Sequence, residues 1–265
     1  MVRAISERSR FALAMLRLLV SKETWPTRYL CELVASARLS SLPWISLSDL
    51  TRCVGSPKLH PELVACGSCS VAELAALSVV TAALNPKSVL EFGTCDGFSA
   101  WHLWANSGAK VLTIDLPRPV RPFLPQDSRI RLLEADSRKW EPPSDEKFDL
   151  CFIDAGHDYE CVRNDSEKAL RCLRPGGVIL WHDATWRREG FGVNQYLREL
   201  RHSGKPVCLL HVSLYDHCSL AILRDGATVS EPWGQDLVTG PSTIALARTL
   251  TAPGVFLPTE PGERE

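Results

Sequence analysis

Five acidic side chains stand where apolar, strand-like segments end, and two histidines lie beside the last two. The acids are Glu91, Asp115, Asp136, Asp154 and Asp183. His157 follows Asp154 by three residues, and His182 directly precedes Asp183. Carboxylates accept hydrogen bonds from hydroxyl groups and hold cations, whereas an imidazole takes up a proton near neutral pH. One strand-end aspartate is often only a helix cap, but five along one edge of a sheet indicate a ligand site.

The segment Ser88–Ser99 has the form of a strand, a glycine turn and a helix start. Its apolar run includes Glu91, and Gly93 and Gly97 flank the turn. Glycine allows left-handed backbone conformations and a close approach of ligand, which is how α/β proteins hold nucleotide-like molecules. The spacing E-x-G-x-x-x-G-x-S lacks the three glycines of the dinucleotide fingerprint. Since Glu91 also lies near a would-be pyrophosphate, the segment favours a ligand that carries an amino acid or a cationic sulfur.

Two further acids follow at positions where an adenosine group would lie. Asp115 comes roughly twenty residues after the glycine turn, where an acid accepts hydrogen bonds from ribose hydroxyls. Asp136 and Ser137 end the next strand-like segment. They either face an adenine edge or form a simple turn, and the sequence leaves both readings open.

Strand and helix patterns alternate around these residues. Strands are expected at 88–92, 111–115, 130–136, 148–154 and 177–183, with a closing pair at 206–212 and 219–223. Ser70 and Glu73 form a capping box before a helix that ends at Asn85. Strands separated by helical lengths are typical of parallel βαβ units. The sequence therefore predicts an α/β fold: a Rossmann-like doubly wound sheet, mostly parallel with an antiparallel C-terminal hairpin, plus an N-terminal helical extension.

Three blocks, in order, carry a family resemblance. Phe152–Tyr159 reads F-I-D-A-G-H-D-Y, Val162–Asp165 reads V-R-N-D, and Leu173–Asp183 reads L-R-P-G-G-V-I-L-W-H-D. With the glycine turn before them, the chain resembles class I S-adenosylmethionine-dependent methyltransferases. More narrowly, it is similar to the small-molecule O-methyltransferase-like group with F-I-D-A-x-H-x-Y and P-G-G-x-x-x-x-H-D motifs. The resemblance spans about residues 70–225.

The resemblance implies a set of binding residues and a cofactor, S-adenosyl-L-methionine. The expected cofactor-binding residues are Glu91, Gly93, Gly97, Ser99, Asp115, Asp136, Ser137 and Asp154. The positions of Asp154, His182 and Asp183 carry magnesium ligands in metal-dependent members. Histidine at 182 departs from the usual carboxylate, because oxygen ligands suit magnesium whereas nitrogen suits softer ions such as manganese or zinc. Whether magnesium, manganese or no metal serves the reaction is left open.

His157 is the expected general base, because an acceptor hydroxyl is a poor nucleophile at neutral pH. The alternative is a structural loop histidine bonded to a neighbouring carboxylate. The resulting function is O-methylation of a hydroxyl on a small molecule, a sugar or a secondary metabolite. A metal-independent methyltransferase with another acceptor and a non-catalytic binding or scaffold protein are the alternatives. A nicotinamide-dependent oxidoreductase is disfavoured by the absence of G-x-G-x-x-G.

Domain limits are expected at 1–69 for an N-terminal helical or cap region, 70–226 for the Rossmann-like methyltransferase domain, and 227–265 for a tail. The segment Trp186–Gly192 reads either as a loop over the acceptor or as a plain connection. Nothing in the sequence names the acceptor, since the N-terminal region and the tail match no recognised pattern.

Composition and charge limit the kinds of partner and cellular location that the protein can have. The formal net charge of −1 gives no electrostatic reason to expect a nucleic-acid partner. Phe11–Val20 is apolar, but it is too short to span a bilayer and Arg17 interrupts it, so no membrane span is expected. The ten cysteines are scattered, and the lone pair Cys66 and Cys69 predicts neither a zinc site nor a redox dithiol. These features favour a cytoplasmic protein with a small-molecule partner and leave a homo-oligomer open.

Overall fold

A computed structural model describes residues 44–46, 57–62, 69–185, 190–211 and 218–227 of the chain. The chain divides into two compact units, Met1–Leu33 with Gly240–Glu265 and Val34–Thr239. Every described residue lies in the second unit. The limits predicted for the N-terminal region and the tail, and the segment 186–189, fall largely or wholly outside the described residues.

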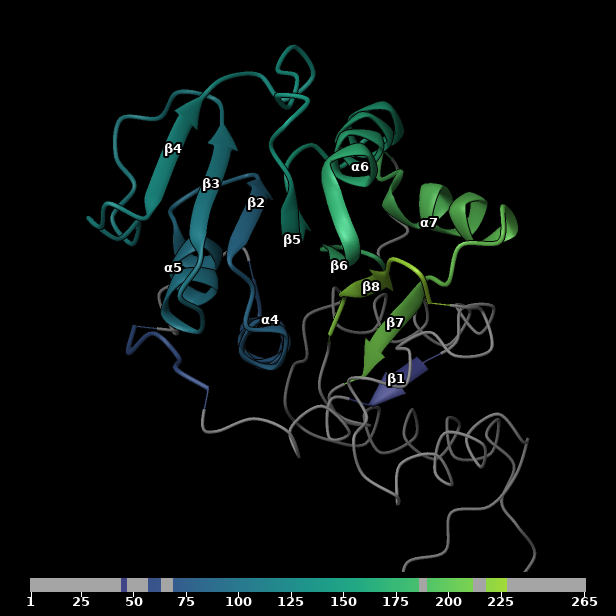
Figure 1. Cartoon of the computed structure of the whole chain (residues 1–265), viewed down its shortest axis with the longest axis horizontal. Helices are drawn as coiled ribbons and strands as arrows, with labels where there is room; N and C mark the ends of the chain where they lie inside the picture. Colours follow the sequence, from purple (N-terminus) through teal and green to yellow (C-terminus); the bar gives the residue numbers. More distant parts are fainter. Residues whose placement is uncertain (1–43, 47–56, 63–68, 186–189, 212–217, 228–265) are drawn as a thin grey trace, which may run out of the picture. The chain divides into compact units, whose positions relative to one another are not determined.

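An eight-stranded sheet forms the centre of this unit (Figure 1). Its strands are β1 (Trp44–Ser46), β2 (Ser88–Phe92), β3 (Lys110–Asp115), β4 (Ile130–Glu134), β5 (Phe148–Ile153), β6 (Leu173–Trp181), β7 (Cys208–His211) and β8 (Ala221–Arg224). They lie in the order β1-β7-β8-β6-β5-β2-β3-β4. β2 pairs in parallel with both β3 and β5, so the strand order reverses at β2. In open α/β sheets, ligands bind beyond the carboxyl ends of the strands at such a point.

One of the two closing strands, β8, runs against the rest of the sheet. β8 is antiparallel to both β6 and β7. All the other strand pairs in the described part of the sheet are parallel. The predicted fold, a mostly parallel Rossmann-like sheet with an antiparallel C-terminal pair, is confirmed.

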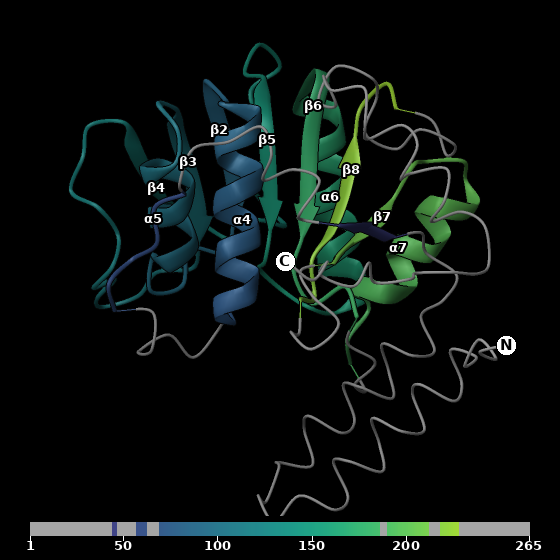
Figure 2. The same ribbon diagram turned by 90° about the horizontal axis from the view of Figure 1, so that it is seen from below.

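Four described helices cover the two faces of the sheet (Figures 1 and 2). They are α4 (Val71–Leu84), α5 (Phe98–Ala105), α6 (Tyr159–Cys172) and α7 (Val193–His202). Alternate residues of a strand point to opposite faces. Leu90 therefore shares a core with Val162 of α6, while its neighbour Val89 shares the other core with Leu77 of α4. Burial on both faces makes the sheet doubly wound.

The capping box before α4 forms as predicted. The Glu73 amide donates to Ser70 Oγ at 3.2 Å, and the Ser70 amide donates to Glu73 Oε2 at 2.7 Å. Asn85 then ends the helix in a left-handed conformation with φ of 44°. Local chemistry alone thus fixes both ends of this helix.

Two expectations about secondary structure were wrong. No helix connects β3 to β4 or β4 to β5, although the spacing had suggested alternating strands and helices. The first of these connections carries prolines at 117, 119, 122 and 125, which cannot continue a helix. In addition, Trp44–Ser46 is a strand paired in parallel with β7, within a region expected to be helical.

None of the helices in the described ranges is long and apolar enough to cross a membrane.

Candidate active site

The turn between β2 and α5 can accept only glycine at its two flanking positions. Gly93 and Gly97 have φ of 96° and 92°, in the left-handed region. A Cβ atom on Gly93 would lie 2.0 Å from the backbone oxygen of Asp154, at the end of β5. A Cβ atom on Gly97 would lie 2.4 Å from the backbone nitrogen of Leu124. The turn is therefore pressed against the strand end where β2 and β5 separate, and against the loop after β3.

Gly93→Ala is expected to disrupt this turn, because the new methyl group meets backbone rather than a movable side chain. We expect a loss of several kcal/mol in the free energy of unfolding, on the order of the largest single-substitution effects. Chemical denaturation of the variant measures it. Gly176→Ala is the matched control, since that glycine also has a positive φ but no atom within 4 Å of its Cβ position. Equal losses in both variants would show that backbone strain, and not the contact with Asp154, requires glycine.

Asp115, which the sequence predicts to bind the ribose hydroxyls, lies beside the turn. Its Oδ2 accepts hydrogen bonds from the Cys95 amide at 2.7 Å and from Arg121 Nη1 at 2.8 Å, and its Oδ1 accepts one from the Leu116 amide at 2.8 Å. The Arg121 side chain is only 5% exposed. Arg121, which the sequence reasoning missed, thus holds the carboxylate in place from the proline-rich loop.

Glu91 is fully buried beneath the turn. In the sheet it pairs with Thr113, whose hydroxyl donates to Glu91 Oε2. Burial raises the pKa of Glu91 to about 7, although hydrogen bonds with Ser99 and Thr113 act in the opposite direction. The structure thus brings Glu91 and Ser99 together, both of them buried. A direct contact of either residue with the cofactor stays a prediction.

Asp136 and Ser137 make contacts that are typical of a simple turn, one of the two alternatives that the sequence leaves open. Asp136 Oδ1 accepts hydrogen bonds from the amide and from Nε of Arg138, both at 3.0 Å. Ser137 Oγ donates to Asp165 Oδ2 at 3.2 Å. Their predicted place beside an adenine ring is not tested by these contacts.

The carboxyl ends of β5 and β6 bring the second group of predicted residues together. Ile153 pairs with Trp181, so the next residues, Asp154 and His182, leave the sheet side by side. His182 Nδ1 lies 3.2 Å from Asp154 Oδ1 and 3.3 Å from Asp183 Oδ1. Asp183 has φ of 54°, a left-handed conformation that is uncommon for a residue other than glycine. This strained backbone turns the Asp183 carboxylate toward the same site.

His157 and Asp183 form a close pair on the open side of the site. His157 Nε2 lies 2.8 Å from Asp183 Oδ2, and the His157 side chain is 39% exposed. The hydrogen bond to Asp183 is the largest cause of a raised His157 pKa, and burial of the ring partly opposes it. The same contact holds the pKa of Asp183 below its ordinary value despite burial. The carboxylate thus fixes the ring and increases its basicity.

His182 is buried between carboxylates on two sides. Its Nε2 lies 3.2 Å from Glu73 Oε2, opposite the contacts that Nδ1 makes. Glu73 Oε1 in turn accepts a hydrogen bond from the Ser219 amide at 2.9 Å. Burial is the largest single influence and disfavours a charged ring, but the neighbouring Asp154, Cys69 and Asp183 together more than offset it, so the pKa of His182 is well above its ordinary value. Glu73 therefore both caps helix α4 and contacts His182. The sequence indicated only the capping contact.

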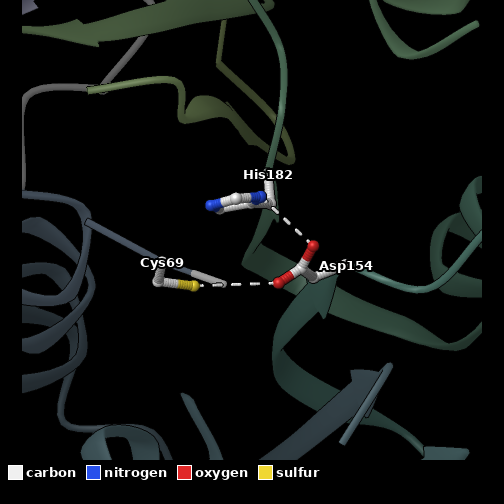
Figure 3. A group of neighbouring side chains, drawn as sticks. All are labelled: Cys69, Asp154 and His182. Atoms are coloured by element: carbon white, nitrogen blue, oxygen red, sulfur yellow. Dashed lines mark hydrogen bonds and ion pairs between the residues drawn. The ribbon is translucent and has the colours of Figure 1, made fainter. Parts of the chain in front are cut away.

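Cys69 is the second residue that sequence reasoning missed. It directly precedes the cap of α4, and its thiol lies 3.8 Å from Asp154 Oδ2 (Figure 3). Burial is the main cause that raises the pKa of the Cys69 thiol to about 12. No local pattern could have found this contact, because its partner comes from the end of β5.

The three residues predicted as metal ligands are close together, but they belong to two overlapping groups. Ligand atoms lie within 4.8 Å of one another in the group Cys69, Asp154 and His182 and in the group Asp154, His157 and Asp183. Asp154 is common to both. A nitrogen and a sulfur among the donors fit magnesium poorly, since magnesium takes oxygen ligands, and fit a softer divalent cation better.

A small recess opens at this edge of the sheet. Its walls come from β5 and β6, the residues that follow them, and helices α6 and α7: Ile153, Asp154, Ala155, Gly156, His157, Val162, Trp181, His182 and Val193. Both groups of potential ligands contribute to this recess through Asp154. Asp154, one of the lining residues, also meets Gly93 of the glycine turn through its backbone.

Residues 90–184 match the family described as a methyltransferase domain. This range contains the glycine turn, Asp115, Asp154, His157 and the pair His182–Asp183. The match supports a class I S-adenosylmethionine-dependent methyltransferase domain.

Two curated proteins are similar to parts of this chain. An uncharacterized protein of Sinorhizobium fredii is 36% identical over 110 residues, which are 40% of this chain and 10% of that protein. Catechol O-methyltransferase B of Danio rerio is 28% identical over 141 residues, 48% of this chain and 52% of that protein. The chain thus spans about a tenth and about half of the lengths of these two relatives.

Solved structures of similar fold include methyltransferases with different acceptor atoms. An O-methyltransferase from Bacillus cereus is 16% identical, with coverage of 79% of this chain and 94% of that chain and a TM-score of 0.44. The N-methyltransferase NodS from Bradyrhizobium japonicum is 23% identical, with coverage of 57% and 92% and a TM-score of 0.44.

Proposed function

We propose that the protein transfers the methyl group of S-adenosyl-L-methionine to a hydroxyl group of a small molecule. The observation that supports this most is the position of the His157–Asp183 pair next to the glycine turn. Asp154 connects the two: its backbone meets Gly93, and its side chain lies 3.9 Å from His157 Nε2. A site that holds a donor at the turn and an acceptor at His157 brings the reacting groups together, which lowers the entropic barrier to transfer.

In the proposed reaction His157 removes the proton from the acceptor hydroxyl. Its Nε2 is engaged by Asp183, so Nδ1 is the nitrogen that accepts this proton. The acceptor oxygen forms a bond to the methyl carbon while the bond from that carbon to the sulfonium sulfur breaks. The products are the methyl ether and S-adenosylhomocysteine, with the proton left on the imidazole. Asp183 stabilises the resulting positive charge.

The other predicted residues have proposed roles in binding the cofactor and a cation. Asp115 would accept hydrogen bonds from the ribose hydroxyls, and Gly93 and Gly97 would let the amino-acid portion approach the backbone. A divalent cation held by Asp154, His182 and Asp183 would polarise the acceptor oxygen, and the mixed donor set favours manganese over magnesium there. The acceptor is proposed only as a small hydroxyl compound, such as a sugar or a phenolic secondary metabolite.

Thermal unfolding with S-adenosylhomocysteine tests the cofactor assignment. At about one hundred times its dissociation constant, a ligand adds roughly 2.7 kcal/mol of stability. We expect that shift for the wild type and its loss in Asp115→Ala. Asp127→Ala is the matched control, an aspartate that pairs with Arg129 and is not among the predicted cofactor-binding residues. A shift with NAD in place of S-adenosylhomocysteine would instead support an oxidoreductase.

A further inference from the structure

Asp154 and His182 belong to the set proposed above to hold a divalent cation, whereas their neighbour Cys69 has no task in the proposed reaction; the inference about this inner group of Cys69, Asp154 and His182 therefore deepens that proposal. Its residues come from three places in the fold: the start of α4, the end of β5 and the end of β6 (Figure 3). All three offer a ligand atom within 4.8 Å of the others. His157 Nε2 lies 3.9 Å from Asp154 Oδ1, the oxygen that His182 Nδ1 also approaches, whereas Cys69 Sγ lies near Asp154 Oδ2.

The surroundings of His182 indicate that this inner group holds a cation. His182 is 5% exposed, and neither of its ring nitrogens has a hydrogen bond of good geometry, although carboxylate oxygens lie 3.2–3.3 Å away. A buried polar atom without a hydrogen bond costs free energy. Glu73, Asp154 and Asp183 also place three carboxylates around one ring. A cation bound to one nitrogen would satisfy that nitrogen and offset the negative charge.

We propose that Cys69, Asp154 and His182 bind a thiophilic divalent cation of the zinc class, with Cys69 as the sulfur ligand. Hard cations such as magnesium take oxygen ligands only, whereas a set of sulfur, nitrogen and oxygen is typical of zinc. The distance of 3.8 Å from Cys69 Sγ to Asp154 Oδ2 is close to the spacing of about 3.5 Å between ligands in tetrahedral zinc sites. Three protein ligands leave a fourth position open, as in catalytic zinc sites.

The carboxylates around His182 fit the second layer of such a site. A ligating histidine usually donates its other ring N–H to a carboxylate, which orients the ring. Each ring nitrogen of His182 has a carboxylate neighbour: Nε2 lies beside Glu73, and Nδ1 lies beside Asp154 and Asp183. Whichever nitrogen binds the cation, the other can therefore donate to a carboxylate. The amides of Ser70 and Ser219 hold Glu73 in place. The capping box of α4 thus also positions a metal-binding histidine.

Cobalt(II) substitution of the purified full chain, after chelator treatment, tests the proposal. A cobalt–thiolate bond gives a charge-transfer band in the near ultraviolet, which needs no enzyme activity. We expect one equivalent of cobalt or zinc per chain, the charge-transfer band in the wild type, and no band in Cys69→Ser. Zinc affinity should fall by more than about 100-fold in Cys69→Ser, beyond the 10- to 100-fold typical of outer partners. Magnesium in large excess should not displace zinc.

Two control variants separate this site from the chain's other thiols. Cys208→Ser removes a buried cysteine of β7, and Cys66→Ser removes the neighbour in the sequence; both should retain the band. Unfolding of metal-free Cys69→Ser and Cys69→Ala shows whether these variants are folded. Unchanged zinc affinity in folded Cys69→Ser or Cys69→Ala, or no zinc bound by the wild type, would overturn the proposal.

Binding of S-adenosylhomocysteine is measured on the same samples. This measurement tests the proposed methyltransferase function separately from the proposed metal site. Although both sites share Asp154, Cys69 is not among the residues proposed to hold the cofactor or the base. Zinc binding without cofactor binding would contradict the proposed function only. Cofactor binding without zinc binding would contradict the metal site only.

Discussion

His157→Gln is expected to lower kcat for methyl transfer by about 10²- to 10⁴-fold, the usual contribution of a general base. Glutamine has a similar size and hydrogen-bonding capacity, but it cannot take a proton from the acceptor hydroxyl. The dissociation constant for S-adenosylhomocysteine should change little, because the proposed cofactor contacts lie at the glycine turn and Asp115. Single-turnover assays with labelled S-adenosylmethionine and calorimetry of product binding measure the two effects.

His202→Gln serves as the matched control, since His202 is an exposed residue at the end of α7. It should retain the activity of the wild type. If His157→Gln retained it too, His157 would be the structural loop histidine of the alternative reading. Loss of cofactor binding together with activity would indicate a collapse of the site rather than loss of a base.

Glu91→Gln is expected to stabilise the cofactor-free protein at pH above 7 and to change little at pH 4. The pKa of Glu91 is about 4.5 as an ordinary glutamate and about 7 when buried beneath the turn. The folded state therefore binds more protons than the unfolded state between these values, and the stability of the wild type falls as pH rises through that window. Each pKa unit corresponds to 1.36 kcal/mol, so the loss amounts to about 3 kcal/mol. Glutamine does not ionise, so the variant does not lose this stability as the pH rises.

Urea unfolding of wild type and variant at pH 4.5, 6 and 7.5 measures this difference. Other groups titrate in the same range, so the informative quantity is the free energy of unfolding of the variant minus that of the wild type. Glu134→Gln is the control, an exposed glutamate on β4. A difference for Glu91→Gln that does not grow with pH would contradict the described environment of Glu91.

The sequence predicted those parts of the structure that depend on local patterns. Apolar runs ending in acids located β2, β3 and β5, and the capping signature of Ser70 located the start of α4. The motifs after β5 and β6 correctly placed Asp154 and His182 together, because parallel strands end at the same edge of a sheet. These features need only the order and type of nearby residues.

What the sequence did not predict depends on contacts between distant segments. Glu73 satisfied a local capping pattern completely, so nothing in the pattern indicated its second contact with His182. Cys69 was read with Cys66 as a lone C-x-x-C pair, whereas its structural partner is Asp154. Arg121 lies in a proline-rich connection where a helix was expected, and its contact with Asp115 follows from how that loop folds back. Side-chain pairs of this kind are set by tertiary packing.

A crystal structure of the protein with S-adenosylhomocysteine tests the central claim most directly. The account predicts that the ribose hydroxyls contact Asp115, that the amino-acid portion lies along Gly93 and Gly97, and that the sulfur faces the recess beside Asp154 and His157. Binding of the ligand at any other place, or no binding at saturating concentration, would contradict the account.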